Sequence, residues 1–159
     1  MEHVVRLERV AEQLTAVVRK QVNSETIGAQ VGQVLAAGAC YKHLNAIGVG
    51  DLGFNVFLYR DEQDRCLLNS ATGLVLEIGV QVNRRFSGSD EVLLSSTPGG
   101  LVARTTHIGA YDGLSAAHQA VRSWCRENHR AIAGPNWEIY GDWSDDPGQC
   151  HTDVVYLLA

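Results

Sequence analysis

The feature that most constrains the fold of this chain is a hydrophobic pattern that occurs twice. A strand-like stretch at 14–22 precedes a helical stretch, and the same order returns from 100–108, so that Leu14 falls on Leu101 at an offset of about 87 positions. The two helical stretches have apolar stripes that match at the same offset: Ile27, Val31, Val34 and Leu35 in the first, and Leu114, His118, Val121 and Cys125 in the second. An offset shared by strand and helix indicates two copies of one unit.

Two further strands complete each unit, and both show the period-two alternation of a half-buried strand. They lie at 53–59 and 74–82 in the first half and at 136–140 and 152–158 in the second. Each half is therefore predicted to be β-α-β-β with one long helix, which makes the chain an α+β protein. Because a single helix covers one face of a small sheet, we expect the halves to meet about a pseudo-two-fold axis, with antiparallel sheets toward one another around a central cleft.

The same pattern predicts one domain over 1–159. Its pseudo-repeats cover about 1–86 and 91–159, joined by a Ser/Gly/Asp linker at 87–90. An additional strand at 3–10 is expected to extend an edge of the sheet.

Composition narrows the functional classes. The net charge of −5 and the scattered basic residues predict no direct binding to DNA. No run of eighteen apolar residues and no secretion signal is visible, so we expect a cytoplasmic protein without a membrane segment. Four cysteines, Cys40, Cys66, Cys125 and Cys150, form no C-x-x-C pair and are interpreted as small apolar side chains in a reducing compartment. Neither a metal nor a cofactor is expected.

Several motifs of the second half occur in a characteristic order. They are Pro98-Gly99-Gly100-Leu101-Val102-Ala103, His107-Ile108-Gly109-Ala110-Tyr111-Asp112-Gly113-Leu114, a helix containing Trp124, Gly134-Pro135 followed by Trp137-Glu138-Ile139-Tyr140, and Thr152-Asp153-Val154-Val155-Tyr156. In this order and spacing the chain resembles the GyrI-like, or AraC effector-binding, family, whose members occur alone and fused to transcription regulators of the AraC and MerR types.

The resemblance implies a duplicated β-α-β-β (SHS2-like) fold whose central cleft binds small molecules, typically large aromatic or cationic compounds. It also implies a glutamate at the pocket, on the Trp-Glu-Ile-Tyr-like strand, and by motif position this is Glu138. The family's last strand more often has Thr-Glu-Ile where this chain has Thr152-Asp153-Val154, so the role of Asp153 stays open.

Glu138 lies between the apolar residues Trp137 and Ile139. If these neighbours face the helix, Glu138 and Tyr140 face the cleft. Burying a carboxylate without a partner costs several kcal/mol, roughly, and a ligand cation would supply that partner. The alternative is a solvent-facing glutamate on an edge strand.

The same alternation sorts the aromatic residues. Tyr140 and Phe57 share the cleft side with Asn55, whereas Trp137 and Phe54 are predicted to lie under the helices. Tyr111 is also a candidate because it precedes the second helix at the cleft rim in the family pattern. Trp143 is a candidate because it lies just beyond the strand that carries Glu138. The predicted ligand-binding residues are Glu138, Tyr140, Phe57, Asn55, Tyr111, Trp143 and Tyr59.

Other catalytic signatures find little support. His107 and His118 have no second ligand four residues away, so a metal site is not predicted, and His118 is interpreted as a hydrogen-bonded interior imidazole. Ser95 and Ser96 lie outside any Gly-x-Ser-x-Gly context, so a serine nucleophile is not predicted.

Three functions remain. The first is a module that binds a hydrophobic cation, for sensing with a separate regulatory protein or for sequestration. The second is a hydrolase of strained electrophiles, with Glu138 as general base and Tyr140 as hydrogen-bond donor. The third is a protein-binding inhibitor of the gyrase type. Ligand identity, pathway and oligomeric state, including a homodimer, stay open.

Overall fold

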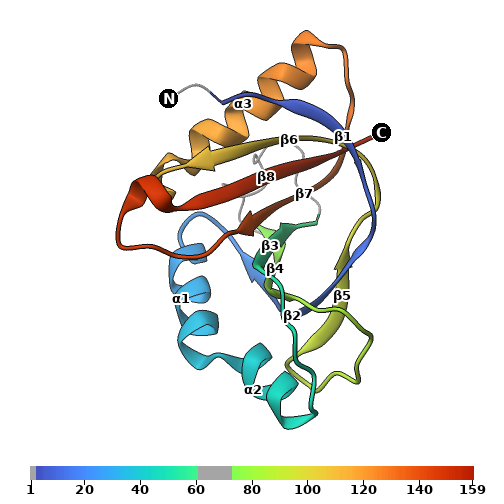
Figure 1. Cartoon of the computed structure of the whole chain (residues 1–159), viewed down its shortest axis with the longest axis vertical. Coiled ribbons are helices and arrows are strands. Elements are labelled where there is room, and N and C mark those ends of the chain that lie inside the picture. Colours follow the sequence, from blue (N-terminus) through green and yellow to red (C-terminus); the bar gives the residue numbers. More distant parts are fainter. Residues whose placement is uncertain (1–2, 61–72) are drawn as a thin grey trace.

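One curled, antiparallel sheet carries the part of the chain that the computed structural model describes, residues 3–60 and 73–159 (Figure 1). Its elements are β1 (Arg6–Val10), β2 (Gln13–Val22), α1 (Ile27–Ala37), α2 (Ala39–Ala46), β3 (Asn55–Tyr59), β4 (Leu74–Gln81), β5 (Leu93–Thr97), β6 (Gly100–Ile108), α3 (Leu114–Glu127), β7 (Ile132–Tyr140) and β8 (His151–Leu158). Short 3-10 turns cover Tyr111–Gly113 and Pro147–Gln149. No helix of the described residues is long and apolar enough to cross a membrane.

The strand order confirms the duplication. It is β1-β6-β8-β7-β3-β4-β2-β5, and exchanging β1–β4 with β5–β8 reads the same order backwards. Val56 of β3 pairs with Ile139 of β7. These two residues hold equivalent places in the two units, so the pseudo-two-fold axis passes through this pair.

The halves join differently from our expectation. Instead of two sheets facing each other, β3 and β7 pair edge to edge and make one continuous sheet. The reason is that each β-α-β-β unit leaves β3 or β7 with an unpaired edge, and pairing these edges satisfies the backbone donors and acceptors of both. The predicted strand at 3–10 is confirmed as β1, which pairs with β6 at one end of the sheet.

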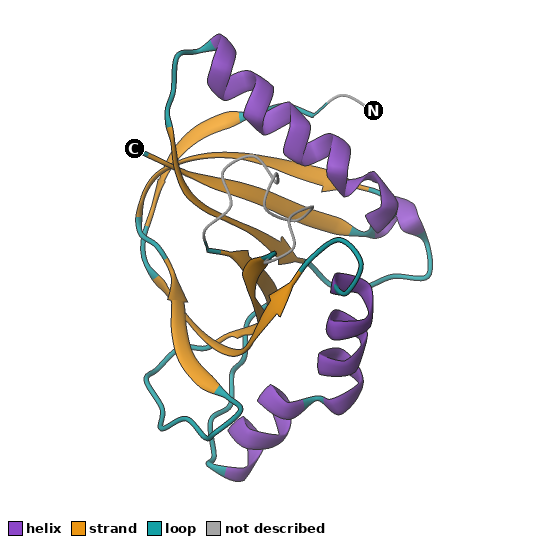
Figure 2. Ribbon diagram, turned by 180° about the vertical axis from the view of Figure 1, so that it is seen from behind, coloured by secondary structure: helices purple, strands orange, loops and turns teal. Residues whose placement is uncertain are grey.

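The three α-helices of the described residues lie on the same face of this sheet, with α3 along one half and α1 and α2 along the other (Figures 1 and 2). The prediction that α3 has a buried stripe is confirmed: Leu114, Ala117, His118, Val121 and Cys125 are buried. In contrast, α1 has no buried residue, although Ile27, Val31 and Val34 are partly buried against β2, β3 and β4. The two halves therefore share a topology but differ in how tightly the helix packs.

Two elements were not expected. The helical segment of the first half is interrupted at Gly38, whose backbone φ of 61° is left-handed and ends α1, and the chain continues as α2. Strand β5 follows the predicted linker and pairs with β2 at the second end of the sheet. It is the counterpart of β1, so each unit contributes a first strand to the edge of the other unit.

Glu77 lies on the sheet face opposite the helices and is fully buried. Arg19 donates to its carboxylate at 2.7 and 3.0 Å, Arg60 donates at 2.9 and 3.1 Å, and the Ser95 hydroxyl donates at 2.5 Å. Burial alone would raise the pKa of Glu77, but the hydrogen bonds from Arg60, Ser95 and Arg19 outweigh it and hold this pKa below its usual value. This cluster links β2, β4, β5 and the end of β3.

The cysteine interpretation agrees with the structure where it can be compared. Cys40, Cys125 and Cys150 are free and buried, whereas Cys66 lies outside the described residues. Burial raises the pKa of the Cys40 thiol to about 11, so this side chain stays protonated near neutral pH.

Candidate functional site

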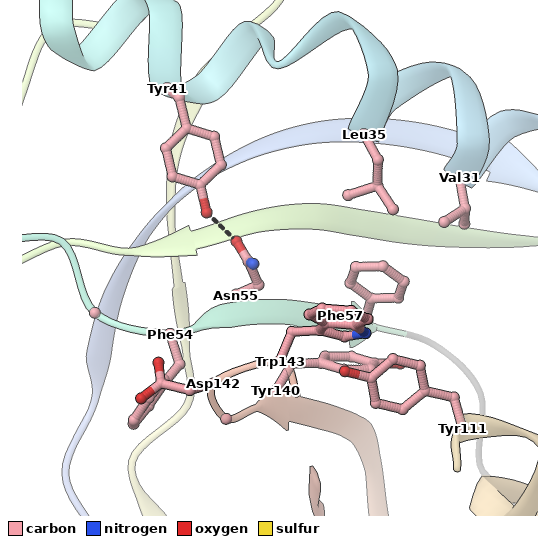
Figure 3. Close-up of a pocket in the computed structure, with 12 residues that line it drawn as sticks. Val31, Leu35, Tyr41, Phe54, Asn55, Phe57, Tyr111, Tyr140, Asp142 and Trp143 are labelled. Atoms are coloured by element: carbon pink, nitrogen blue, oxygen red, sulfur yellow. Dashed lines mark hydrogen bonds between the residues drawn. The ribbon is translucent and has the colours of Figure 1, made fainter. Parts of the chain in front are cut away.

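A cavity of about 560 Å³ opens on the helical face of the sheet, between α1 and the centre of the sheet where β3 meets β7 (Figure 3). Its volume falls in the range of about 300–1,000 Å³ that is usual for small-molecule sites. The lining residues are Val31, Leu35, Tyr41, Gly53, Phe54, Asn55, Phe57, Tyr111, Tyr140, Gly141, Asp142 and Trp143. They come from α1, α2, the segment before β3, β3 itself, β7, the turn before α3 and the segment after β7.

The loose packing of α1 explains where the cavity lies. Figure 3 shows Val31 and Leu35 of α1 on one side of the space, with Phe57, Tyr140 and Trp143 on the other. Leu35 is 55% exposed although it belongs to the apolar stripe of its helix. In the other half, α3 fills the corresponding space, so the second unit has a core where the first unit has a cavity.

Three aromatic rings form a connected wall. The centroids of Phe57 and Tyr140 are 4.9 Å apart with the rings tilted by 50°, and those of Tyr111 and Tyr140 are 5.4 Å apart with the rings nearly perpendicular. Such offset and edge-to-face pairs are favourable arrangements of aromatic quadrupoles. Tyr140 is therefore the central ring of the wall.

Glu138 lies behind this wall and is not among the residues that line the cavity. The residue is 4% exposed. The Tyr140 hydroxyl donates to Glu138 Oε1 at 2.8 Å, and His118 Nε2 of α3 lies 2.6 Å from Glu138 Oε2. Our expectation of a carboxylate without a protein partner is wrong, because α3 lies on the same sheet face as Glu138 and brings His118 to it.

The hydrogen bonds continue from His118 to the surface of α3. His118 Nδ1 lies 2.7 Å from the hydroxyl of Tyr156, and Arg122 donates to that hydroxyl oxygen at 3.2 Å. With the Arg122 donor in place, the Tyr156 hydroxyl can donate to Nδ1 and the imidazole N–H can donate to Glu138, so every donor in the chain points toward the carboxylate. The interpretation of His118 as a hydrogen-bonded interior imidazole is confirmed.

Tyr140 keeps its proton in this environment. Burial, followed by the nearby charge of Glu138 and the hydrogen bond to it, raises the pKa of the Tyr140 phenol far above its usual value. The phenol is consequently a permanent donor to Glu138, and this bond fixes the ring that faces the cavity.

Most of the predicted binding residues meet at this cavity. Five of them line it: Tyr140, Phe57, Asn55, Tyr111 and Trp143. Glu138 and Tyr59 do not, and Tyr59 is 5% exposed within the apolar cluster that lies under α1. Whether the five lining residues bind a ligand stays a prediction.

The predicted positions of two other aromatic residues are wrong. Phe54 lines the cavity and is 47% exposed, because it precedes β3 and does not follow the alternation of that strand. Trp137 packs with Val56, Leu58 and Val102 on the sheet face opposite the helices. The helices and the cavity lie on the same face of the sheet. Because side chains alternate along β7, Glu138 points toward that face and Trp137 points to the opposite face.

Tyr41 and Asp142 also line the cavity, and sequence reasoning missed both. Tyr41 lies on the unexpected helix α2, and its hydroxyl donates to Asn55 Oδ1. Asn55 and Glu138 occupy equivalent strand positions in the two units. In each half a helix supplies the hydrogen-bonding partner: Tyr41 of α2 for Asn55 and His118 of α3 for Glu138. Asp142 is the second residue after β7 and precedes the predicted Trp143, and that adjacency was the one signal that could have indicated it.

Two other residues considered from the sequence, Asp153 and His107, make hydrogen bonds within the protein. Asp153 accepts hydrogen bonds from Arg104 and from the Thr106 hydroxyl. His107 Nε2 lies 2.8 Å from the backbone oxygen of Ala110. Within the described ranges, no three His, Cys, Asp or Glu side chains gather so that they could hold a metal ion.

A duplicated β-α-β-β sheet with an aromatic cavity on its helical face is the architecture that the resemblance of the sequence implied. A family model described as the GyrI-like small molecule binding domain matches residues 3–155, and the chain belongs to that family. No curated protein sequence matches the chain.

Solved structures agree with this fold. The crystal structure of the EcmrR C-terminal domain superposes with a TM-score of 0.73 at 18% identity, covering 100% of this chain and 99% of that one. The structure of SAV2435 bound to tetraphenylphosphonium gives 0.61 at 16% identity, covering 100% and 94%. A hydrolase from Listeria innocua gives 0.60 at 11% identity, covering 98% and 91%. At these identities the likeness supports the fold alone.

Proposed function

We propose that this chain binds a bulky, hydrophobic organic cation in the cavity between α1 and the β3–β7 centre of the sheet. The observation that carries the proposal is where the molecule leaves large apolar side chains exposed. Nine such residues are exposed in the described part of the chain, and five of them line this one cavity: Leu35, Tyr41, Phe54, Tyr111 and Trp143. A concentration of exposed apolar surface around a concavity is typical of a ligand site.

The chemistry of the wall favours a positive charge on the ligand. The faces of Tyr and Trp rings attract a cation by about 0.5–2 kcal/mol each, depending on how far water is excluded. Tyr140, Tyr111 and Trp143 line the cavity from different segments of the chain, so a large cation with aromatic groups could contact several rings at once. The neighbour SAV2435 was solved with such a compound, which makes tetraphenylphosphonium a suitable probe.

Binding is favoured over hydrolysis by the surroundings of Glu138. A general base must reach a water molecule beside the substrate. Here the Tyr140 ring lies at the cavity and Glu138 behind it, with a hydrogen-bonding partner at each carboxylate oxygen. We therefore propose a role in sensing or sequestering the ligand.

Tryptophan fluorescence tests the proposal. Of the three tryptophans, Trp143 lines the cavity and is 68% exposed, whereas Trp137 is buried on the opposite sheet face. We expect tetraphenylphosphonium to quench the emission in a saturable way, with a Kd of about 100 µM or tighter. In Trp143→Phe most of the quenching should disappear while calorimetry still detects binding. Absence of binding at millimolar probe, or quenching that is unchanged in Trp143→Phe, would contradict the proposed site.

A further inference from the structure

We infer that Asp142, and not Glu138, sets the preference of this cavity for a cation. The inference rests on the proposed function and adds the residue that selects the charge of the ligand. The position of Glu138 on its strand had suggested that Glu138 selects the cation, and we assign that role to Asp142 instead.

Asp142 lies at the wall of the cavity. It is the second residue after the end of β7 and lines the cavity between Gly141 and Trp143. Among the described residues that line the cavity, it is the one with a formal charge. Figure 3 shows its side chain at the end of the cavity where Phe54 lies, with Tyr111 at the opposite end.

The carboxylate of Asp142 is available to a ligand. No described residue makes a hydrogen bond or ion pair with it, and the residue is exposed. A ligand cation that enters the cavity can therefore approach Asp142 without displacing a protein partner. The neighbouring side chains of Phe54 and Trp143 would shield the cation from water on the sides that the carboxylate leaves open.

Glu138 differs on both points. It is 4% exposed and lies outside the cavity lining. Its Oε1 accepts a hydrogen bond from the Tyr140 hydroxyl at 2.8 Å, and its Oε2 lies 2.6 Å from His118 Nε2. Direct contact between Glu138 and a ligand would require Tyr140 to leave its place in the aromatic wall, and the ring contacts with Phe57 and Tyr111 oppose that movement. Glu138 therefore positions Tyr140 rather than contacting the ligand.

A pair of probes with the same shape and opposite charge tests the inference. Tetraphenylphosphonium and tetraphenylborate are titrated into the wild-type protein, Asp142→Asn and Glu138→Gln, and the ratio of the two dissociation constants is compared. Wild type should favour the phosphonium, and Asp142→Asn should lower that preference by about three- to fivefold, toward the upper end of the range expected for one exposed ion pair. Glu138→Gln should lower it by less.

Two controls make the outcomes decisive. Asp145→Asn removes an exposed carboxylate from the same loop but outside this cavity, and it should leave the ratio within about twofold. Raising the salt from about 0.05 to 0.5 M should shrink the wild-type preference, because an exposed charge is screened. An unchanged ratio in Asp142→Asn, or an equal or larger loss in Glu138→Gln, would overturn the inference and leave the proposed function standing. If neither probe binds the wild-type protein, the proposed function itself fails.

Discussion

Tyr140→Ala is expected to weaken the binding of tetraphenylphosphonium about 30-fold or more. The substitution removes the central ring of the wall and with it the contacts to Phe57 at 4.9 Å and Tyr111 at 5.4 Å. An aromatic ring supplies about 2 kcal/mol or more through the area that it buries against the ligand, which corresponds to about 30-fold in affinity. Isothermal titration calorimetry of both proteins under the same salt conditions measures the change.

Two matched variants separate the ring from its hydroxyl. Tyr140→Phe keeps the ring and loses the hydrogen bond to Glu138, so binding should weaken by about threefold or less. Ile47→Ala truncates an exposed apolar residue away from the cavity and should change nothing measurable. Wild-type affinity in Tyr140→Ala, with its fold intact by circular dichroism, would show that the probe binds elsewhere.

Glu77→Ala should lower the free energy of unfolding by about 3 kcal/mol at neutral pH, because removing the acid leaves Arg19 and Arg60 beside a buried site without their shared partner. This loss is at the lower end of the range for a broken buried ion pair, because both arginine side chains are partly exposed. Urea unfolding followed by circular dichroism measures it. Glu8→Ala, which removes a 40% exposed carboxylate from ion pairs with Arg6 and Arg104, is the control and should cost about 1 kcal/mol or less.

The effect of Glu77 should depend on pH in a defined direction. The folded protein holds the pKa of Glu77 below its usual value near 4.5, so the ionised side chain stabilises the fold above that value. As the pH falls through the lowered folded-state pKa, this contribution disappears, and wild type and Glu77→Ala should converge in stability. A difference that stays constant down to pH 2 would show that the loss in Glu77→Ala comes from packing rather than charge.

Periodic patterns predicted the regular part of the fold well. The strands at 14–22, 74–82 and 100–108 and the helix beginning at Leu114 appear with boundaries within a few residues. Strand β5 was missed because it contains two serines and its partner β2 is about 80 residues away in the sequence, so no local signal marks it. The end of α1 was missed because Gly38 breaks an apolar run that continues into α2.

The candidate site shows the limit of reasoning from alternation. Alternation grouped Tyr140, Phe57 and Asn55 with Glu138 on one face of the sheet, as the structure has them. It could not tell that the helices cover this same face, and so it could not place His118 against Glu138. That contact depends on how closely α3 approaches the sheet, which is a property of tertiary packing. The cavity likewise arises from the loose packing of α1, which a hydrophobic stripe does not reveal.

The pseudo-two-fold axis explains why one half of the molecule can hold a ligand. Asn55 and Glu138 are equivalent positions, as are Phe57 and Tyr140, so the centre of the sheet presents two similar pairs side by side. The second unit covers Glu138 with α3 and His118, whereas its Tyr140 faces the cavity of the first unit. The first unit leaves its pair open beneath α1, with Tyr41 reaching only Asn55. Divergence of two copies has thus produced one packed half and one open half.

The most direct test of this account is a crystal structure of the protein grown with saturating tetraphenylphosphonium. The account predicts the phosphonium between α1 and the β3–β7 strands, with its rings against Phe57, Tyr140 and Trp143, and with the Tyr140–Glu138 hydrogen bond intact. A probe bound on the opposite face of the sheet, beside Arg104 and Gln81, would contradict it.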